Sequence, residues 1–94
     1  MLVIYMELYK EIEKSFPLLE KLFTVESLLE FKNAPVSDLS LYHFSLGLWI
    51  RNNILYKEDN NLRRLFLKND IIHADEMSSF MINLFHYHLH SLLP

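Results

Sequence analysis

The segment HFSLGLWIRNN, residues 43–53, constrains the fold more strongly than any other part of the chain. Because a helix turns about 100° per residue, this segment and the residues before it present apolar side chains on opposite sides. One face comprises Leu39, Tyr42, Leu46, Trp49, Ile50 and Ile54, and the opposite face comprises Leu41, Phe44 and Leu48. A helix that is apolar on both sides is normally buried among several neighbours. Residues 38–54 are therefore predicted to form a buried central helix.

The rest of the chain also favours helices over strands. One glycine and three prolines supply few turns for hairpins, and no run alternates cleanly between apolar and polar residues. Pro17 suits the first turn of a short helix, and Thr24 can cap the next one. A long C-terminal helix is expected at about residues 74–92. The sequence thus predicts an all-α fold, a compact bundle of five or six helices forming a single domain over residues 1–94.

Gly47 and Trp49 are unusual residues within the predicted central helix. A glycine inside a helix costs about 1 kcal/mol relative to alanine. Since Gly47 shares a narrow stripe with Ser40, we expect another helix to approach closely there. The alternative is a ligand that approaches the backbone at Gly47, although no glycine-rich phosphate loop surrounds it. Trp49 is expected to fill volume in the core.

Arg51 ends this apolar helix and is permanently charged, so it requires a carboxylate partner. The segment HADEMSS, residues 73–79, supplies two candidates. The segment is typical of a helix start, with His73 at or near the cap and Asp75 and Glu76 in the first turn, where the helix dipole favours carboxylates. We expect Arg51 to bond one of them and so clamp the central helix to the last helix. The alternatives are a solvated Arg51 and an Arg51 that contacts a ligand.

These two segments resemble a family of short bacterial proteins known only as a domain of unknown function. In that family the first segment reads His-Phe-Gly-Leu-Gly-x-Trp-Ile-Arg-Asn, and the second reads His-Pro-Asp-Asp-Met-Ser. The matching residues are His43, Phe44, Leu46, Gly47, Trp49, Ile50, Arg51, Asn52, His73, Asp75, Met77 and Ser78. The chain departs from the pattern at Ser45, Ala74 and Glu76. The resemblance covers residues 39 to about 90 and implies a shared fold, and small members of such families resemble partners of secreted bacterial toxins.

The histidines near the C-terminus could suggest a metal site. His86 and His90 have the i, i+4 spacing that can hold zinc. A zinc site needs a third and a fourth ligand, however, and the chain has no cysteine. We therefore expect no metal and no cofactor. His86 and His90 are predicted to face solvent, and His43 and His88 to be partly buried.

Nothing in the spacing of reactive residues predicts catalysis. His73 lies near Asp75, but no nucleophile is fixed beside them, and a residue at a helix start usually caps the helix. Ser78 and Ser79 are interpreted as ordinary surface serines of the last helix. The sequence therefore predicts a protein that is not an enzyme.

Charge and composition limit the partners and the location. Phosphate binding requires many cations, whereas the net charge is −3 and Arg63, Arg64 and Lys68 form the one basic cluster. Nucleic acid is therefore disfavoured. The N-terminal MLVIYM is too short for a membrane span, which needs about 20 apolar residues, and the absence of cysteine favours the cytoplasm.

Carboxylates on the predicted short helices and on the polar loop YKEDN offer a recognition surface. They are Glu20, Glu26, Glu30, Glu58 and Asp59. Such residues would steer a basic partner and speed its encounter. We expect a non-catalytic binding protein, an immunity protein or antitoxin that neutralises a basic toxin domain by direct contact. The alternatives are a regulatory adaptor, a nucleic-acid-associated helical module and a homodimeric structural protein.

Overall fold

The computed structural model describes residues 2–91 and places most of them in helices. The elements are α1 (Leu2–Glu13), α2 (Phe16–Glu20), α3 (Val25–Asn33), η1 (Val36–Tyr42), η2 (His43–Gly47), α4 (Leu48–Ile50), η3 (Arg51–Leu55), α5 (Asn61–Lys68) and α6 (Ala74–Ser91). None of the described residues lies in a strand. The predicted all-α fold with a long C-terminal helix is therefore confirmed. Position 92, the expected end of that helix, lies outside the described residues.

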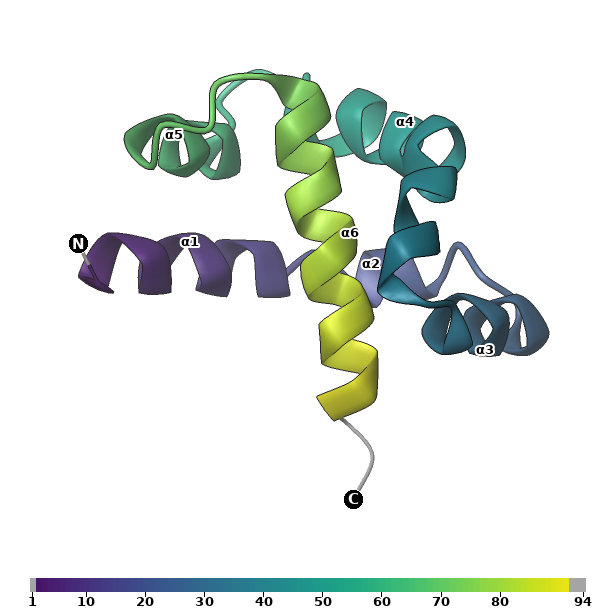
Figure 1. Cartoon of the computed structure of the whole chain (residues 1–94). Coiled ribbons are helices and arrows are strands. Elements are labelled where there is room, and N and C mark those ends of the chain that lie inside the picture. Colours follow the sequence, from purple (N-terminus) through teal and green to yellow (C-terminus); the bar gives the residue numbers. More distant parts are fainter. Residues whose placement is uncertain (1, 92–94) are drawn as a thin grey trace.

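Helix α6 runs through the middle of the molecule (Figure 1). The pair α1 and α5 lies on one side of it, and α3 and α4 lie on the other. Helix α6 contacts α3, η1, η2 and η3 directly. With a radius of gyration of 13.0 Å, the chain is as compact as a folded domain of about 100 residues. The central position belongs to α6, and the segment predicted as the central helix packs against it.

Residues 38–54 do not form one regular α-helix. Element η1 is a 3-10 helix that ends at Tyr42, where φ is −88° and ψ is 1°. The chain then continues through η2 and η3, which are π-helical turns on either side of α4. In the second of them the amide of Tyr56 donates to the carbonyl of Arg51 at 2.9 Å, an i→i+5 bond. A projection that assumes α-helical geometry therefore fails at this end, where Leu55 is fully buried and Ile54 only partly.

The short helices begin where the sequence predicts. Pro17 occupies the first turn of α2. The hydroxyl of Thr24 accepts from the amide of Ser27 at 3.1 Å, and the hydroxyl of Ser27 accepts from the amide of Thr24 at 2.8 Å. This reciprocal capping box satisfies amides that the helix itself leaves unpaired.

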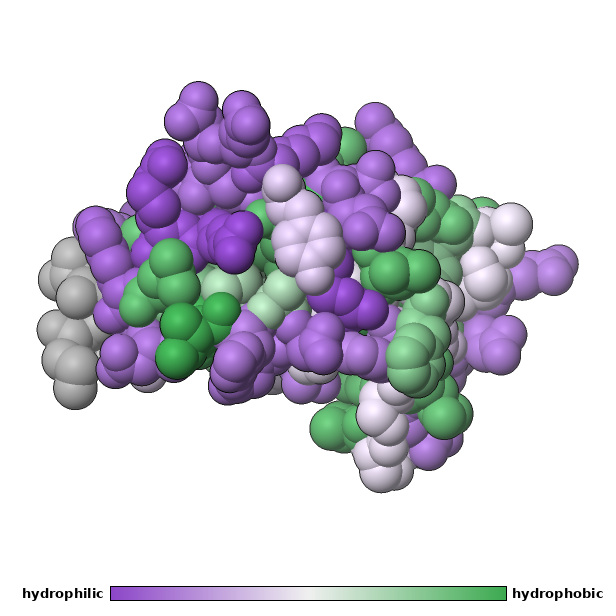
Figure 2. Space-filling model, turned by 90° about the horizontal axis from the view of Figure 1, so that it is seen from above, coloured by the Kyte–Doolittle hydropathy of each residue, from purple (hydrophilic) through white to green (hydrophobic). Residues whose placement is uncertain are grey.

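The prediction that the 38–54 segment is buried on both faces is wrong. Leu41, Phe44 and Leu48 are 75%, 83% and 48% exposed, and we call them the apolar strip. Helix α6 covers only the opposite face, on which Leu46 and Ile50 are buried. The apolar strip therefore lies on the outside of the molecule. Figure 2 shows hydrophobic side chains exposed on the side that carries α4.

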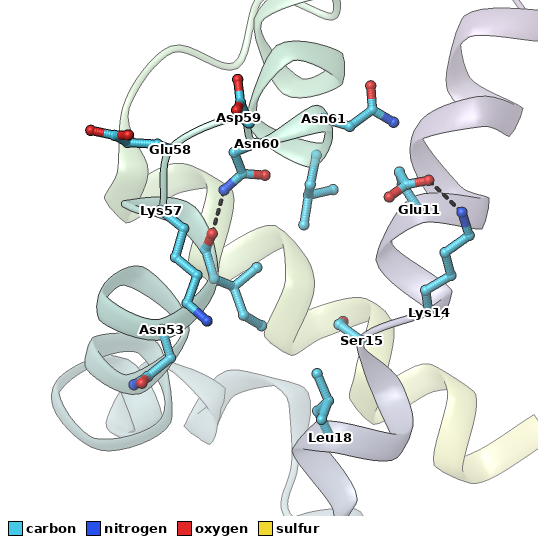
Figure 3. A pocket seen from close by; sticks show the side chains of 12 residues that line it. Glu11, Lys14, Ser15, Leu18, Asn53, Lys57, Glu58, Asp59, Asn60 and Asn61 are labelled. Atoms are coloured by element: carbon cyan, nitrogen blue, oxygen red, sulfur yellow. Dashed lines mark hydrogen bonds and ion pairs between the residues drawn. The ribbon is translucent and has the colours of Figure 1, made fainter.

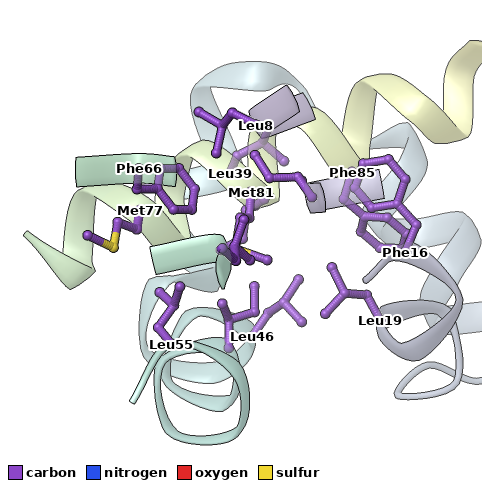
Figure 4. Close-up of a cluster of buried hydrophobic side chains, with 14 of the residues drawn as sticks. Leu8, Phe16, Leu19, Leu39, Leu46, Leu55, Phe66, Met77, Met81 and Phe85 are labelled. Atoms are coloured by element: carbon purple, nitrogen blue, oxygen red, sulfur yellow. The ribbon is translucent and has the colours of Figure 1, made fainter. Parts of the chain in front are cut away.

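The core forms between α6 and the helices that surround it (Figure 4). Met77, Met81 and Phe85 line the inner face of α6 and are completely buried. The ring of Phe85 lies 5.6 Å from that of Phe16 and 5.5 Å from that of Phe31, centroid to centroid. These aromatic contacts join α6 to α2 and α3, and so fix the position of α3 beside the 43–55 segment.

Candidate protein-binding surface

Arg51 is buried and ties the 43–55 segment, which consists of η2, α4 and η3, to the start of α6. Its Nη1 donates to the hydroxyl of Ser78 at 2.9 Å, and its Nη2 donates to the carbonyl of His43 at 3.2 Å. Its Nε lies 3.6 Å from a carboxylate oxygen of Asp75. Asp75 therefore lies near Arg51, but the hydrogen bonds of the guanidinium go to Ser78 and His43 and not to this carboxylate. Ser78 was expected on the surface, and that prediction is wrong because the serine is completely buried beneath the guanidinium.

Gly47 makes room for this arrangement. A methyl group added at its Cα would lie 3.0 Å from Nη1 of Arg51 and 3.7 Å from the side chain of Ile82 on α6. A helix does approach closely here, but the nearest atom belongs to the guanidinium one turn further along the same helix. The glycine and the arginine of the segment HFSLGLWIRNN therefore serve one purpose, which is to fold the Arg51 side chain back against its own helix.

Replacing Gly47 by leucine is expected to lower the free energy of unfolding by about 1 to 3 kcal/mol through overpacking. The new side chain would push both the Arg51 guanidinium and Ile82 away. Urea denaturation followed by helical circular dichroism measures the loss. The control is Ser45→Leu, at an exposed position two residues earlier. If the Gly47 variant is more stable than the parent protein, the close packing at Gly47 is refuted.

The other residues of the sequence motif take different positions. The carbonyl of His73 accepts from the amide of Met77 at 3.0 Å, so His73 stands at the cap of α6, while its side chain is exposed. Asp75 and Glu76 lie in the first turn of that helix. Asn52 is exposed, and Trp49 is half-buried against the core.

His86 and His90 both contact carbonyl groups at the end of α3, and His90 is exposed to solvent as predicted. Their Nε2 atoms lie 3.0 Å from the carbonyl of Ala34 and 2.6 Å from that of Lys32. A carbonyl oxygen only accepts, so each Nε2 carries a hydrogen and donates it. These carbonyls belong to a helix end, where they lack partners within the helix. The predicted exposure of His86 is wrong, since only 6% of the residue is accessible. No group of three or more metal-ligating side chains gathers within residues 2–91.

A hollow lies between the α2–α3 connection and residues 42–49, which run from the end of η1 through η2 into α4. Its volume is about 320 Å³, and its lining consists of Leu22, Phe23, Tyr42, Ser45, Leu46 and Trp49. Ser45 is the one lining residue without a large apolar or aromatic side chain. We call this site the apolar hollow. It has the composition of a site that receives an apolar side chain.

A second hollow of about 330 Å³ shares Tyr42 with the first. Its lining consists of Glu30, Asn33, Ala34, Pro35, Asp38, Leu41 and Tyr42. We call it the acidic hollow, because Glu30 and Asp38 are its charged residues. Leu41 also belongs to the apolar strip, so the strip and both hollows form one continuous surface.

The pKa of Tyr42 reflects this environment. Burial raises the pKa of the phenol above its ordinary value of 10.0, and the negative charges of Glu30 and Asp38 raise it further. A phenolate there would be both poorly solvated and repelled by carboxylates. The acidic hollow therefore disfavours a further negative charge at the point where the hollows meet.

Glu58 and Asp59 border a different and larger pocket (Figure 3). It has a volume of about 420 Å³ and lies where the loop before α5 and the first residues of α5 face the end of α1 and the start of α2. Lys14 and Lys57 line it as well, and Lys14 pairs with Glu11 at 2.7 Å. Both signs of charge are present, so this pocket has no clear preference for the charge of a ligand.

The acidic residues expected to meet a partner are therefore divided between separate places. Glu26 and Glu30 are exposed on α3, and Glu20 is half-buried at the end of α2. Glu58 and Asp59 lie just before α5, which Figure 1 shows on the other side of α6 from α3.

Asp38 was not predicted as a site residue, and Tyr42, which is half-buried, was expected only on the apolar face of the 38–54 helix. Asp38 lies in a 3-10 helix, and Tyr42 ends it. Their relation to Glu30 depends on α3 returning beside η1, and no pattern in the linear sequence signals that approach.

The fold and this surface define a small all-helical domain with an unpartnered apolar face. The chain belongs to a family whose model matches residues 10–89 and is described as a domain of unknown function (DUF6794). Membership of an uncharacterised domain family is thereby confirmed. The match also includes residues 10–38, which the resemblance described above did not cover.

No curated protein and no solved structure matches this chain. Within residues 2–91, none of the helices combines the length and the apolar character that crossing a membrane requires.

Proposed function

We propose that this protein is a non-catalytic binding protein, an immunity protein or antitoxin that neutralises a toxic protein by covering part of its surface. The observation that supports this function best is the apolar strip, whose side chains are 48% to 83% exposed although the same helix is buried on its other face. Contiguous exposed apolar side chains of this kind mark protein interaction sites. A bacterial and cytoplasmic setting is part of the proposal.

The charges near the strip support a basic partner. Asp38 and Glu30 lie in the hollow that Leu41 also lines, and Glu26 is exposed on the same helix as Glu30. Apolar contacts would supply most of the affinity, and the carboxylates would select the partner and speed its encounter. This combination is typical of inhibitors that act by occupying a positively charged surface.

The test is co-expression with the product of the neighbouring gene in a host that this product poisons. We expect this protein to restore growth and to copurify with the toxin as a stable complex. We also expect Glu58→Lys together with Asp59→Lys to slow association more than it speeds dissociation, because carboxylates away from the contact act by steering. Binding kinetics at low and high salt measure both rates.

A neighbouring product that is harmless alone, or that forms no complex with this protein, would refute the immunity function. A concentration-dependent dimer of this protein would then favour the homodimeric alternative. A salt-dependent gel shift would favour the nucleic-acid alternative.

A further inference from the structure

We infer that the partner inserts a large apolar side chain into the apolar hollow and places a lysine or arginine beside Glu30 and Asp38. The inference rests on the proposed binding function and adds the surface and the chemistry of the partner. It therefore predicts a recognition segment in which an apolar anchor and a cation lie close together, as on one face of a short helix.

The apolar hollow has the size and lining for such an anchor. Its volume of about 320 Å³ is sufficient for a leucine, phenylalanine or tryptophan side chain, and Phe23 and Trp49 provide broad aromatic walls. Binding energy in protein interfaces concentrates where an aromatic or aliphatic anchor fills a desolvated pocket. The exposed apolar strip beside the hollow extends the contact over the rest of the segment.

The charge of the surface determines which kind of partner residue can lie beside the apolar anchor. Among the described residues, neither the apolar nor the acidic hollow is lined by a lysine, arginine or histidine. Glu30 and Asp38 therefore meet no opposite charge from the lining itself. A carboxylate from a partner would be repelled there, whereas a lysine or arginine would gain a complementary contact. The pKa of Tyr42 is raised by burial first and then by the charges of Glu30 and Asp38, so the second part of this shift agrees with the negative environment.

The charge also argues against a second copy of this chain as the occupant. A twofold dimer joins the same patch of both subunits. It would bring two acidic hollows into one interface without a cation from either lining. The pocket at Glu58 and Asp59 is a weaker candidate for a basic segment, because Lys14 and Lys57 already line it.

A displayed library of random peptides, selected on the purified full chain, tests the inference. We expect the enriched peptides to combine a phenylalanine, leucine, tryptophan or methionine with a nearby lysine or arginine. Synthetic copies of them should bind Glu30→Lys/Asp38→Lys at least about tenfold more weakly than the parent protein. Ser45→Arg should have a similar effect, since it adds a long charged side chain to the lining of the apolar hollow.

Glu58→Lys/Asp59→Lys is the matched control, because it changes the net charge by the same amount at the other pocket. At high salt, where long-range steering is screened, its affinity for the peptides should change by less than about threefold. Thermal unfolding of each variant separates loss of binding from loss of fold, and Glu30 and Ser45 are both exposed. The inference is refuted if no peptide is enriched, if the enriched peptides lack cations, or if the control pair weakens binding as much as the Glu30 and Asp38 pair.

The same variants in the co-expression assay separate this inference from the proposed function. If Glu30→Lys/Asp38→Lys and Ser45→Arg still neutralise the toxin, the function stands and the assigned surface is wrong. If no toxin is neutralised but the peptides bind through Ser45 and Glu30, the surface stands and the immunity function is wrong. A dimer of the parent protein that Ser45→Arg abolishes would overturn the inference in favour of a second copy.

Discussion

Replacing Phe85 by alanine is expected to lower the free energy of unfolding by about 3 to 5 kcal/mol, the cost of removing a large aromatic side chain from a packed core. Phe85 is completely buried on α6. Its ring contacts those of Phe16, Phe23 and Phe31, with centroids 5.6, 6.2 and 5.5 Å away. The change would therefore leave a cavity where α2, α3 and α6 meet. The total stability of a chain of this size is only about 5 to 14 kcal/mol, so the variant would be partly unfolded at moderate temperature.

The matched control is Tyr87→Ala, an aromatic truncation two residues further along α6. Tyr87 is 68% exposed, so its replacement should cost less than about 0.5 kcal/mol. Urea denaturation measures both variants. A loss below about 1 kcal/mol for Phe85→Ala would show that the aromatic cluster does not hold α2 and α3 in place. The apolar hollow and the acidic hollow would then lack a fixed wall.

Local chemistry made much of the fold predictable. Pro17, Thr24 and the acidic residues after His73 act within a few positions of the chain, so their effects on helix starts can be read directly. The nearness of Asp75 to Arg51 could be predicted as well, because a charge at the end of an apolar helix favours a carboxylate and HADEMSS offers two, whereas the hydrogen bonds of Arg51 to Ser78 and to the His43 carbonyl could not. These are statements about short-range geometry and about the pairing of a buried charge.

The burial of other residues could not be predicted, because it depends on contacts between residues that lie far apart in the sequence. His86 is buried because its Nε2 reaches the carbonyl of Ala34, fifty-two residues earlier in the chain. Ser78 is buried because Arg51 folds back over Gly47 towards it. A helical projection shows which side chains share a face, but it cannot show which neighbouring helix covers that face. Residues 38–54 were expected to be buried on both sides for the same reason, because the projection does not show that only one of their faces is covered.

The error at the apolar strip is informative about function. If Leu41, Phe44 and Leu48 were buried, the packing of the core would be sufficient to explain why these positions are apolar. Their exposure leaves apolar surface that folding does not use, next to the apolar hollow and to the acidic hollow with its two carboxylates. The core of α6 and the Arg51 cluster stabilise the inner face of the 43–55 segment, whereas its outer face stays exposed.

The cluster around Arg51 should depend more on its buried hydrogen bonds than on its ion pair. Arg51 is 6% exposed, and its guanidinium donates to Ser78 and to the carbonyl of His43. The carboxylate of Asp75 lies 3.6 Å from Nε and its side chain is 73% exposed. Water screens a pair with one exposed partner, so such a pair contributes at most about 1 kcal/mol. A buried acceptor that loses its hydrogen-bond donor lowers the free energy of unfolding by about 1 to 3 kcal/mol.

We therefore expect Arg51→Ala to lower the free energy of unfolding by about 2 to 4 kcal/mol, through the loss of these donors and of the packed side chain beside Gly47. Asp75→Asn, which removes only the charge, should cost less than about 1 kcal/mol. Arg51→Lys should not restore the parent stability, because a single ammonium cannot reproduce the fork that reaches both Ser78 and His43. Denaturation midpoints of the three variants measure these differences. An unchanged midpoint for Arg51→Ala would mean that Arg51 is free to bind a ligand, whereas an equal loss in Asp75→Asn would mean that the ion pair, and not the buried hydrogen bonds, clamps α6 to its neighbour.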